Sequence, residues 1–237
     1  MNNIHLPPVV KNLLIINILF FIGTLVFHPG GGYPLIDWFA VYYFGSEKFR
    51  IWQPITYMFM HSPVDYFHII FNMFALYSFG SVLESKWGAK KFLIFYFITG
   101  LGALALQWAV QTFEIYHSVG HLIANISSYA PKTKAEYDLL SDIYFGPMLG
   151  ASGAIFGLLV AFGMLYPNAE LLIMFIPIPV KAKYIIPIYI LVELFLGVKQ
   201  FEGDSVAHYA HLGGALIGFI MVKIWKDKDD TFYTLYE

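Results

Sequence analysis

Six stretches of mostly apolar residues run along the 237-residue chain, and each approaches the length needed to cross a lipid bilayer. A hydrocarbon core of about 30 Å requires roughly 20 such residues in a helix, and only helices or closed barrels satisfy the backbone polar groups in lipid. Hydrophobic residues make up 58% of the chain and charged residues only 13%. We therefore predict an all-α membrane protein, a polytopic bundle of six transmembrane helices that forms a single domain over residues 1–237. The predicted spans are 9–27, 66–83, 92–113, 152–166, 184–198 and 206–225.

The charges indicate partners and orientation. A formal net charge of −2 without a basic run argues against a nucleic-acid partner, and the lack of cysteine excludes disulfides and thiol chemistry. No cofactor and no metal are expected, and the oligomeric state stays open. Lysine and arginine are more frequent in the loops on the side of both termini. This bias predicts that both termini face the cytoplasm.

Two loops differ from simple connections between helices. Residues 35–60 are rich in aromatic side chains but interrupted by charged residues and Pro54, which predicts an interfacial, partly re-entrant loop. The segment 114–147 is uncommonly long for a connection in a bundle, which indicates an extramembrane flap or an amphipathic piece.

Two runs of small residues stand out in the apolar stretches, one around Ser152 and one around His211. The helix faces that carry them include Gly153, Gly214 and Gly218, and small residues at this spacing let two membrane helices approach backbone to backbone. Such an approach would bring the hydroxyl to the imidazole. Because a serine is a weak nucleophile until a base takes its proton, the pair predicts nucleophilic catalysis. The alternative is that both side chains serve packing and local hydrogen bonds.

Further polar groups fall at the same predicted depth as this pair. His68 and Asn72 are four residues apart and therefore share one helical face. Acyl transfer needs hydrogen-bond donors for the oxyanion, and we assign this role to His68, Asn72 and the turn at Gly150. The free N–H groups at the start of the helix that begins at Ser152 would add further donors.

The sequence indicates less about the residues that surround the His211 imidazole. Phe156 lies one turn after Ser152 and would either stack on His211 or serve as a lipid-facing or core aromatic residue. No carboxylate occurs at a spacing that would orient this histidine, which favours a Ser-His dyad over a triad. Glu193 is an intramembrane carboxylate that should face a partner or water, and it receives no role. His208, one turn before His211, is interpreted as a histidine at the rim of the site or behind its reacting groups, rather than as a second base.

Other titratable residues receive structural interpretations. Glu84, at the far end of the second stretch, is expected to pair with a cation or to cap a helix end. Glu114, His117 and His121 have a helical spacing that would suit a metal, but a solvated loop face is the preferred interpretation.

The motifs together resemble those of the rhomboid intramembrane serine proteases, in their basic six-helix bacterial form, and the resemblance covers nearly the whole chain. The first loop, with Trp52-Gln53 and the aromatic run to His61, is similar to that of the family. The family patterns G-x-S-G, A-H-x-x-G-x-x-x-G and H-x-x-x-N are matched by Gly150-Ala151-Ser152-Gly153, by Ala210-His211 with Gly214 and Gly218, and by His68 with Asn72.

The resemblance implies that the chain cleaves transmembrane protein substrates within or beside their membrane helices, at small residues in locally unstable helix. It also implies that the fifth span, 184–198, acts as a lateral gate. From the bacterial form of the family we expect a bacterial inner membrane, with the active site open to its outer side. Gln53 replaces the arginine that is frequent in the family. Two other functions stay open. A non-catalytic relative that binds membrane clients is disfavoured because Ser152 and His211 are both retained, and a transporter is disfavoured because no inverted repeat is evident.

Overall fold

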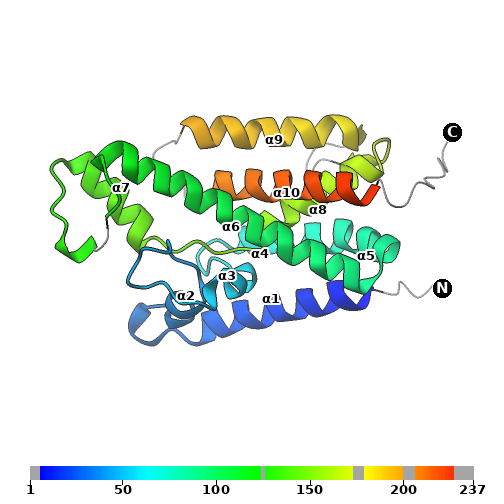
Figure 1. Ribbon diagram of the computed structural model, residues 1–237. Helices are drawn as coiled ribbons and strands as arrows, with labels where there is room; N and C mark the ends of the chain where they lie inside the picture. Colours follow the sequence, from blue (N-terminus) through cyan, green and yellow to red (C-terminus); the bar gives the residue numbers. More distant parts are fainter. Residues whose placement is uncertain (1–5, 124–125, 173–178, 200–205, 227–237) are drawn as a thin grey trace.

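The computed structural model describes residues 6–123, 126–172, 179–199 and 206–226. Over these residues the chain forms a bundle of long helices that lie side by side, with shorter elements at its two ends (Figure 1). A two-stranded antiparallel sheet pairs β1 (Glu170–Leu172) with β2 (Pro179–Lys181) and is a small addition to this bundle. The expected all-α membrane fold is confirmed.

The long helices begin and end within a few residues of the predicted spans, with one exception. The third helix continues six residues past Phe113 and ends at a cap on Gly120, whose φ is 84°. The α-helices of the described residues are α1 (Pro8–Val26), α2 (Pro34–Phe39), α3 (Gln53–Thr56), α4 (Tyr66–Ala75), α5 (Ser81–Trp87), α6 (Ala89–Val119), α7 (Lys134–Phe145), α8 (Ser152–Leu165), α9 (Ala182–Lys199) and α10 (His208–Lys226).

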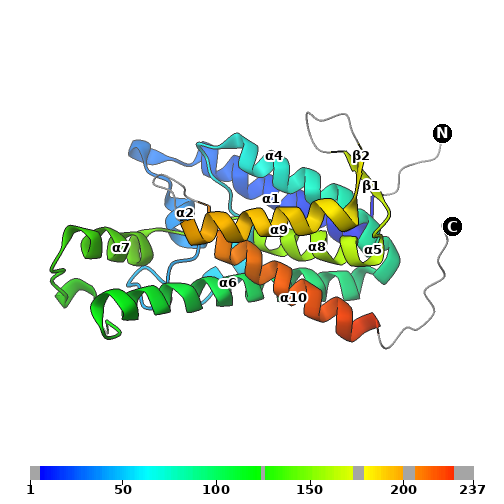
Figure 2. The ribbon, with the colours of Figure 1, turned by 90° about the horizontal axis from the view of Figure 1, so that it is seen from above.

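Three helical segments of the described chain are long and apolar enough to cross a membrane, namely Pro8–Val26, Tyr66–Trp87 and Ala89–Val119. The second of these joins α4 to α5 through a π-helical turn, η3 (Leu76–Gly80). Helix α8 is apolar but has only 14 residues. The start of α1 and the end of α10 lie at one end of the bundle, whereas α2 and α7 lie at the other end (Figures 1 and 2).

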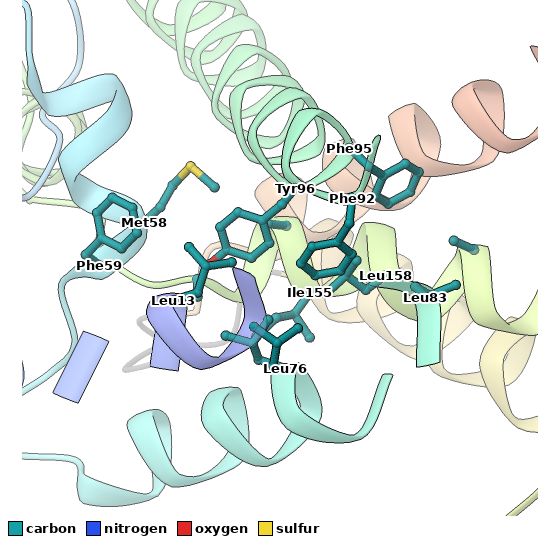
Figure 3. Packing of buried hydrophobic residues seen from close by; sticks show 14 of the residues in the cluster. Leu13, Met58, Phe59, Leu76, Leu83, Phe92, Phe95, Tyr96, Ile155 and Leu158 are labelled. Carbon is teal, nitrogen blue, oxygen red and sulfur yellow. The ribbon is translucent and has the colours of Figure 1, made fainter. Parts of the chain in front are cut away.

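The core lies where α1, α6 and α8 meet the helical segment from α4 to α5. Large apolar side chains from these helices interdigitate there, and apolar burial of this kind stabilises a fold where side chains exclude both water and lipid. Figure 3 shows the packing of Leu13, Leu76, Phe92, Tyr96, Ile155 and Leu158.

Glu84 on α5 holds the start of α1. Its two carboxylate oxygens accept hydrogen bonds from the backbone N–H groups of Val9 and Val10, at 2.9 and 2.7 Å. These N–H groups lack acceptors within their own helix, and a negative charge is favourable at a helix N-terminus. The helix-capping alternative expected for Glu84 is therefore confirmed.

The first loop folds around a buried glutamine. Gln53, at the start of α3, is fully buried, accepts from the Arg50 N–H at 2.9 Å and donates to the Lys48 carbonyl at 3.2 Å. Its neutral amide thus satisfies backbone groups on both sides of a tight loop. Trp38 and Trp52 remain exposed nearby, as aromatic residues at a membrane interface would be.

The long segment after α6 contains an amphipathic helix, as one of the two expectations for it proposed. Thr133 is the N-cap of α7, and its hydroxyl accepts from the Glu136 N–H at 3.1 Å. The carboxylate of Glu136 in turn accepts from the Tyr129 hydroxyl and the Lys132 N–H. The apolar face of α7 packs with the end of α6 and the first loop in a separate cluster of Tyr43, Ile115, Ile126, Leu140, Ile143 and Tyr144.

Candidate active site

Ser152 is the first residue of α8 and follows a turn that requires glycine. Gly150 has a φ of 129°, a range that residues with a side chain rarely adopt. Its N–H donates to the Tyr57 carbonyl at 3.0 Å, which ties the turn to the first loop. A Cβ added to Gly150 would lie 2.8 Å from His68 Nε2 and 3.5 Å from Ser152 Oγ. Both the backbone conformation and the available space therefore exclude a side chain here.

His211 lies in the first turns of α10, with its imidazole against Ser152. The Nε2 atom is 2.8 Å from Ser152 Oγ, a normal hydrogen-bond distance. The Phe156 ring stacks on the imidazole, with a centroid separation of 4.3 Å and an interplanar angle of 10°. The imidazole is thus held on one face while Nε2 meets the hydroxyl. This is the mutual geometry of a nucleophile and its base.

The two side chains meet because α8 and α10 approach backbone to backbone. A Cβ at Gly214 would overlap the carbonyl of Gly153, and a Cβ at Gly218 would lie 2.8 Å from the Cα of Gly157. A Cβ on Gly153 would also contact Ala103 of α6 at 2.5 Å. The small-residue faces identified in the sequence are therefore the surfaces along which α6, α8 and α10 touch.

The expectation that no carboxylate orients His211 is wrong. Glu193 Oε2 on α9 lies 2.9 Å from His211 Nδ1, and the glutamate is only 4% exposed. The sequence argument failed because it considered spacing along one segment, whereas Glu193 reaches the histidine from a different helix. With a proton on Nδ1, the imidazole donates to Glu193 and leaves Nε2 to accept from Ser152.

The same carboxylate oxygen also meets His208, at 2.7 Å from Nδ1. His208 is therefore a buried partner of Glu193, which confirms the interpretation of a histidine behind the site and not the alternative of a position at the rim. Ligand atoms of Glu193, His208 and His211 lie within 4.8 Å of one another, so the three residues have the types and the proximity of a metal-binding set. Hydrogen bonds from the two Nδ1 atoms explain this proximity without a metal.

A signal for this cluster was present in the sequence. A carboxylate in a membrane helix needs a nearby partner, and histidines three residues apart lie on one helical face. His208 and His211 form such a pair in the helix that follows Glu193.

His68 lies on α4 beside the turn before Ser152, and Asn72 follows one turn later on the same helix. His68 Nδ1 accepts from the Ser62 N–H at 3.4 Å, which leaves the proton of a neutral imidazole on Nε2, the atom that faces Gly150. Asn72 Nδ2 donates to the His68 carbonyl at 2.7 Å, so one of its two N–H bonds is used and the other is available.

His61 at the end of the first loop extends this polar group. It is fully buried, and its ring centroid lies 5.0 Å from that of His68. Neither ring nitrogen has a hydrogen-bond partner within the described residues. Burial, with a smaller contribution from the neighbouring His68, lowers the pKa of His61 to about 3, so the ring is neutral at pH 7. Sequence reasoning gave His61 no separate role.

In this bundle of apolar helices a half-buried serine lies at hydrogen-bond distance from a buried histidine. These features define a class, the membrane proteins with a serine-hydrolase arrangement. Comparison with known protein families identifies a Rhomboid domain over residues 48–227. The chain belongs to the rhomboid family, whose members are in general serine intramembrane proteases.

Several curated relatives share part of this sequence. The chain is 31% identical over 173 residues to RHOMBOID-like protein 12, mitochondrial, of Arabidopsis thaliana, covering 72% of this chain and 45% of the relative. It is 30% identical over 177 residues to the human presenilin-associated rhomboid-like protein, mitochondrial, covering 71% and 38%. It is 29% identical over 160 residues to Rhomboid protein 1, mitochondrial, of Saccharomyces cerevisiae, covering 67% and 38%.

These relatives limit what can be transferred to the chain, and they correct the expected bacterial origin. The chain spans about half or less of the length of the curated relatives that it matches. The names of these relatives describe them as mitochondrial, and they give no support to a bacterial origin or a bacterial inner membrane. Membership of the rhomboid family and integration in a membrane are unaffected by this correction.

Proposed function

We propose that the protein is an intramembrane serine endopeptidase that cleaves the transmembrane segments of other membrane proteins. The observation that carries this proposal is the 2.8 Å contact between Ser152 Oγ and His211 Nε2 inside a helical bundle. The imidazole is only 9% exposed. A base this close to a half-buried hydroxyl meets the requirement for activating a serine.

The reaction follows from the roles of these two groups. Ser152 Oγ attacks the carbonyl carbon of a peptide bond while His211 Nε2 takes its proton. The tetrahedral intermediate collapses, the C–N bond breaks, and the imidazolium returns the proton to the leaving amine. Water then attacks the acyl-enzyme with His211 as base, which releases the new carboxyl terminus and restores the serine.

The oxyanion would form beside Gly150. The point where a Cβ on Gly150 would lie is 2.8 Å from His68 Nε2 and 3.5 Å from Ser152 Oγ. A developing oxyanion needs donors at about 2.7 to 3.1 Å from its position, and we assign this role to His68 Nε2, which faces the same glycine as the Ser152 hydroxyl. The free N–H of Asn72 and the N–H groups at the start of α8 are further donors, favoured by the positive end of the helix dipole.

The substrate class follows from the surroundings of the site and from the family. A membrane helix can reach a buried site sideways only if a surrounding helix moves, and we assign this gate to α9. Helix α9 contains Pro187 and exposes most of its large apolar side chains. We also propose that both chain termini lie on the membrane face with more lysine and arginine and that the active site opens to the other face.

A non-catalytic protein that binds membrane clients is the main rival, and a transporter is a weaker one. Neither function needs a serine hydroxyl at hydrogen-bond distance from a histidine whose other nitrogen meets a carboxylate. The geometry therefore favours the protease.

The test is cleavage of a fluorescently labelled single-span protein by the purified enzyme in liposomes. Ser152→Ala should abolish cleavage, while Ser81→Ala, which removes a buried hydroxyl on the neighbouring segment of the bundle, should not. Both variants should retain the thermal unfolding midpoint of the wild type. Cleavage by Ser152→Ala at the wild-type rate would refute the proposal.

A further inference from the structure

Glu193 occupies a position that the proposed reaction leaves unexplained. It is an almost fully buried carboxylate in an apolar helix, and its Oε2 lies 2.9 Å from His211 Nδ1 and 2.7 Å from His208 Nδ1. A buried charge without partners is strongly unfavourable in this setting. The two imidazoles meet this need, and one of them is the base of the proposed reaction.

The geometry points to Glu193 as the positioning residue of a Ser-His-Glu triad, and hence to α9 as a helix on which catalytic alignment depends. This inference rests on the proposed function, because it assigns a partner to the histidine of that reaction. It replaces the dyad that the sequence favoured.

The contacts describe a complete chain of hydrogen bonds through His211. Ser152 Oγ donates to Nε2, and Nδ1 donates to the Glu193 carboxylate. A carboxylate at Nδ1 selects the tautomer that leaves Nε2 free to accept a proton, and it stabilises the imidazolium that forms during attack. The Phe156 ring fixes the plane of the imidazole, but a stacked ring cannot select a tautomer. Glu193 supplies that selection.

The second histidine gives this arrangement its rigidity. His208 Nδ1 donates to the same Oε2 atom, so the carboxylate is held from two positions on α10, one turn apart. A side chain held in this way loses rotamer freedom before substrate arrives, which is the preorganisation that catalytic groups require. His208 thus acts on the reaction through Glu193, at one step further from the serine.

The three members of the triad come from three helices. Ser152 starts α8, His211 lies on α10 and Glu193 lies on α9. The contact between α8 and α10 is fixed by their glycines, whereas α9 reaches the site through the carboxylate. A displacement of α9 would therefore separate Glu193 from His211 without moving the serine from the histidine.

The experiment measures steady-state cleavage and the histidine tautomer in a set of purified variants. Glu193→Ala and Glu193→Gln remove the charge, Glu193→Asp shortens its side chain, and Leu194→Ala, a lipid-exposed position beside it on α9, is the matched control. For Glu193→Ala we expect kcat to fall by about 100-fold or more with KM little changed, since proton transfer by a positioned base contributes roughly 10²- to 10⁴-fold. Glu193→Asp should recover part of kcat, and Leu194→Ala should equal the wild type.

Nitrogen-15 spectra of the imidazoles separate orientation from folding. In the wild type His211 should show its proton on Nδ1, and in Glu193→Ala a mixture of both tautomers. Glu193→Gln keeps an acceptor of similar shape, so it should retain the fold and the Nδ1 tautomer while losing the charge, and kcat should fall by less than in Glu193→Ala. A variant that merely loosened the fold would lower the unfolding midpoint without this order of tautomers and rates.

Two outcomes decide between the inference and the proposed function. Wild-type kcat and an unchanged tautomer in folded Glu193→Ala, with no cleavage by Ser152→Ala, would overturn the triad and leave the protease. Equal cleavage by the wild type and Ser152→Ala would overturn the protease itself, and the triad with it.

Discussion

Two sides of α8 show how differently this protein holds its helices together. Toward α10 the contact is made of backbone, with Gly153 against Gly214 and Gly157 against Gly218. Toward α9 the contact is made of side chains, such as the Ile186 side chain beside Gly163 and the Tyr189 ring beside Phe156.

The two sides also differ in burial. Helix α8 buries most of its residues, whereas α9 buries only Ala182, Ile186, Glu193 and Gly197 in its 18-residue length. Packed backbones have little room to rearrange, while flexible side chains do. The serine and the histidine therefore lie on a rigid pair of helices, whereas Glu193 lies on a helix that is held more loosely.

The largest effect is expected from Gly214→Ala, which tests the backbone contact between α8 and α10. Gly214→Ala would drive its methyl group into the Gly153 carbonyl, and backbone cannot move aside as a side chain does. We expect a loss of about 3 kcal/mol or more of stability, at the upper end of overpacking effects, together with loss of cleavage. The midpoint of thermal unfolding in detergent measures it. An unfolding midpoint equal to that of the wild type would show that α8 and α10 are not in backbone contact.

The next largest effect is expected from engineered disulfides that tie α9 to its neighbours. Because the chain contains no cysteine, only the two introduced thiols can pair. The pair Gly163→Cys and Ile186→Cys joins α8 to the start of α9, where the two Cβ positions are 3.6 Å apart. The pair Gly197→Cys and His208→Cys joins the end of α9 to α10, with Cβ positions 3.2 Å apart. Disulfides favour about 3.5 to 4.5 Å, so the second pair needs a small adjustment.

If α9 swings away at the end near the active site, the second disulfide should reduce cleavage of a membrane substrate by an order of magnitude, and the first should have little effect. Each oxidised protein is compared with the same protein after reduction, which removes the effect of the substitutions themselves. Equal cleavage before and after reduction in the second pair would argue against α9 as a gate.

The smallest effect is expected from Gly163→Ala, which is the matched control for Gly214→Ala. Gly163→Ala adds the same methyl group on the α9 side, 2.9 Å from Ile186 Cδ1, which is the flexible end of a side chain. Alanine is favoured over glycine in a helix by about 1 kcal/mol, so we expect an unfolding midpoint equal to or slightly above the wild type. A drop as large as that of Gly214→Ala would erase the distinction between the two sides.

The sequence predicted the parts of the site that depend on spacing within one helix. Ser152, His211 and the glycines on their faces follow from residues three and four apart, and Phe156 one turn from Ser152 follows from the same rule. The bounds of most long helices were also predictable, because apolar stretches of the required length are rare outside membranes.

The missed features depend on how separate helices are rotated against one another. The contact of Glu193 with His211 joins α9 to α10, and no periodicity within either helix encodes it. The extra turns of α6 were missed for a different reason. Glu114 and His117 look like loop residues, but a helix ends where its cap lies, at Gly120, and not where its apolar character stops.

The central claim is an activated serine that depends on an imidazole, and covalent labelling by a fluorophosphonate tests it most directly. The detergent-purified wild type should be labelled, whereas folded Ser152→Ala and His211→Ala should not. Labelling of Ser152→Ala at the wild-type level, or of His211→Ala at the wild-type rate, would contradict the account.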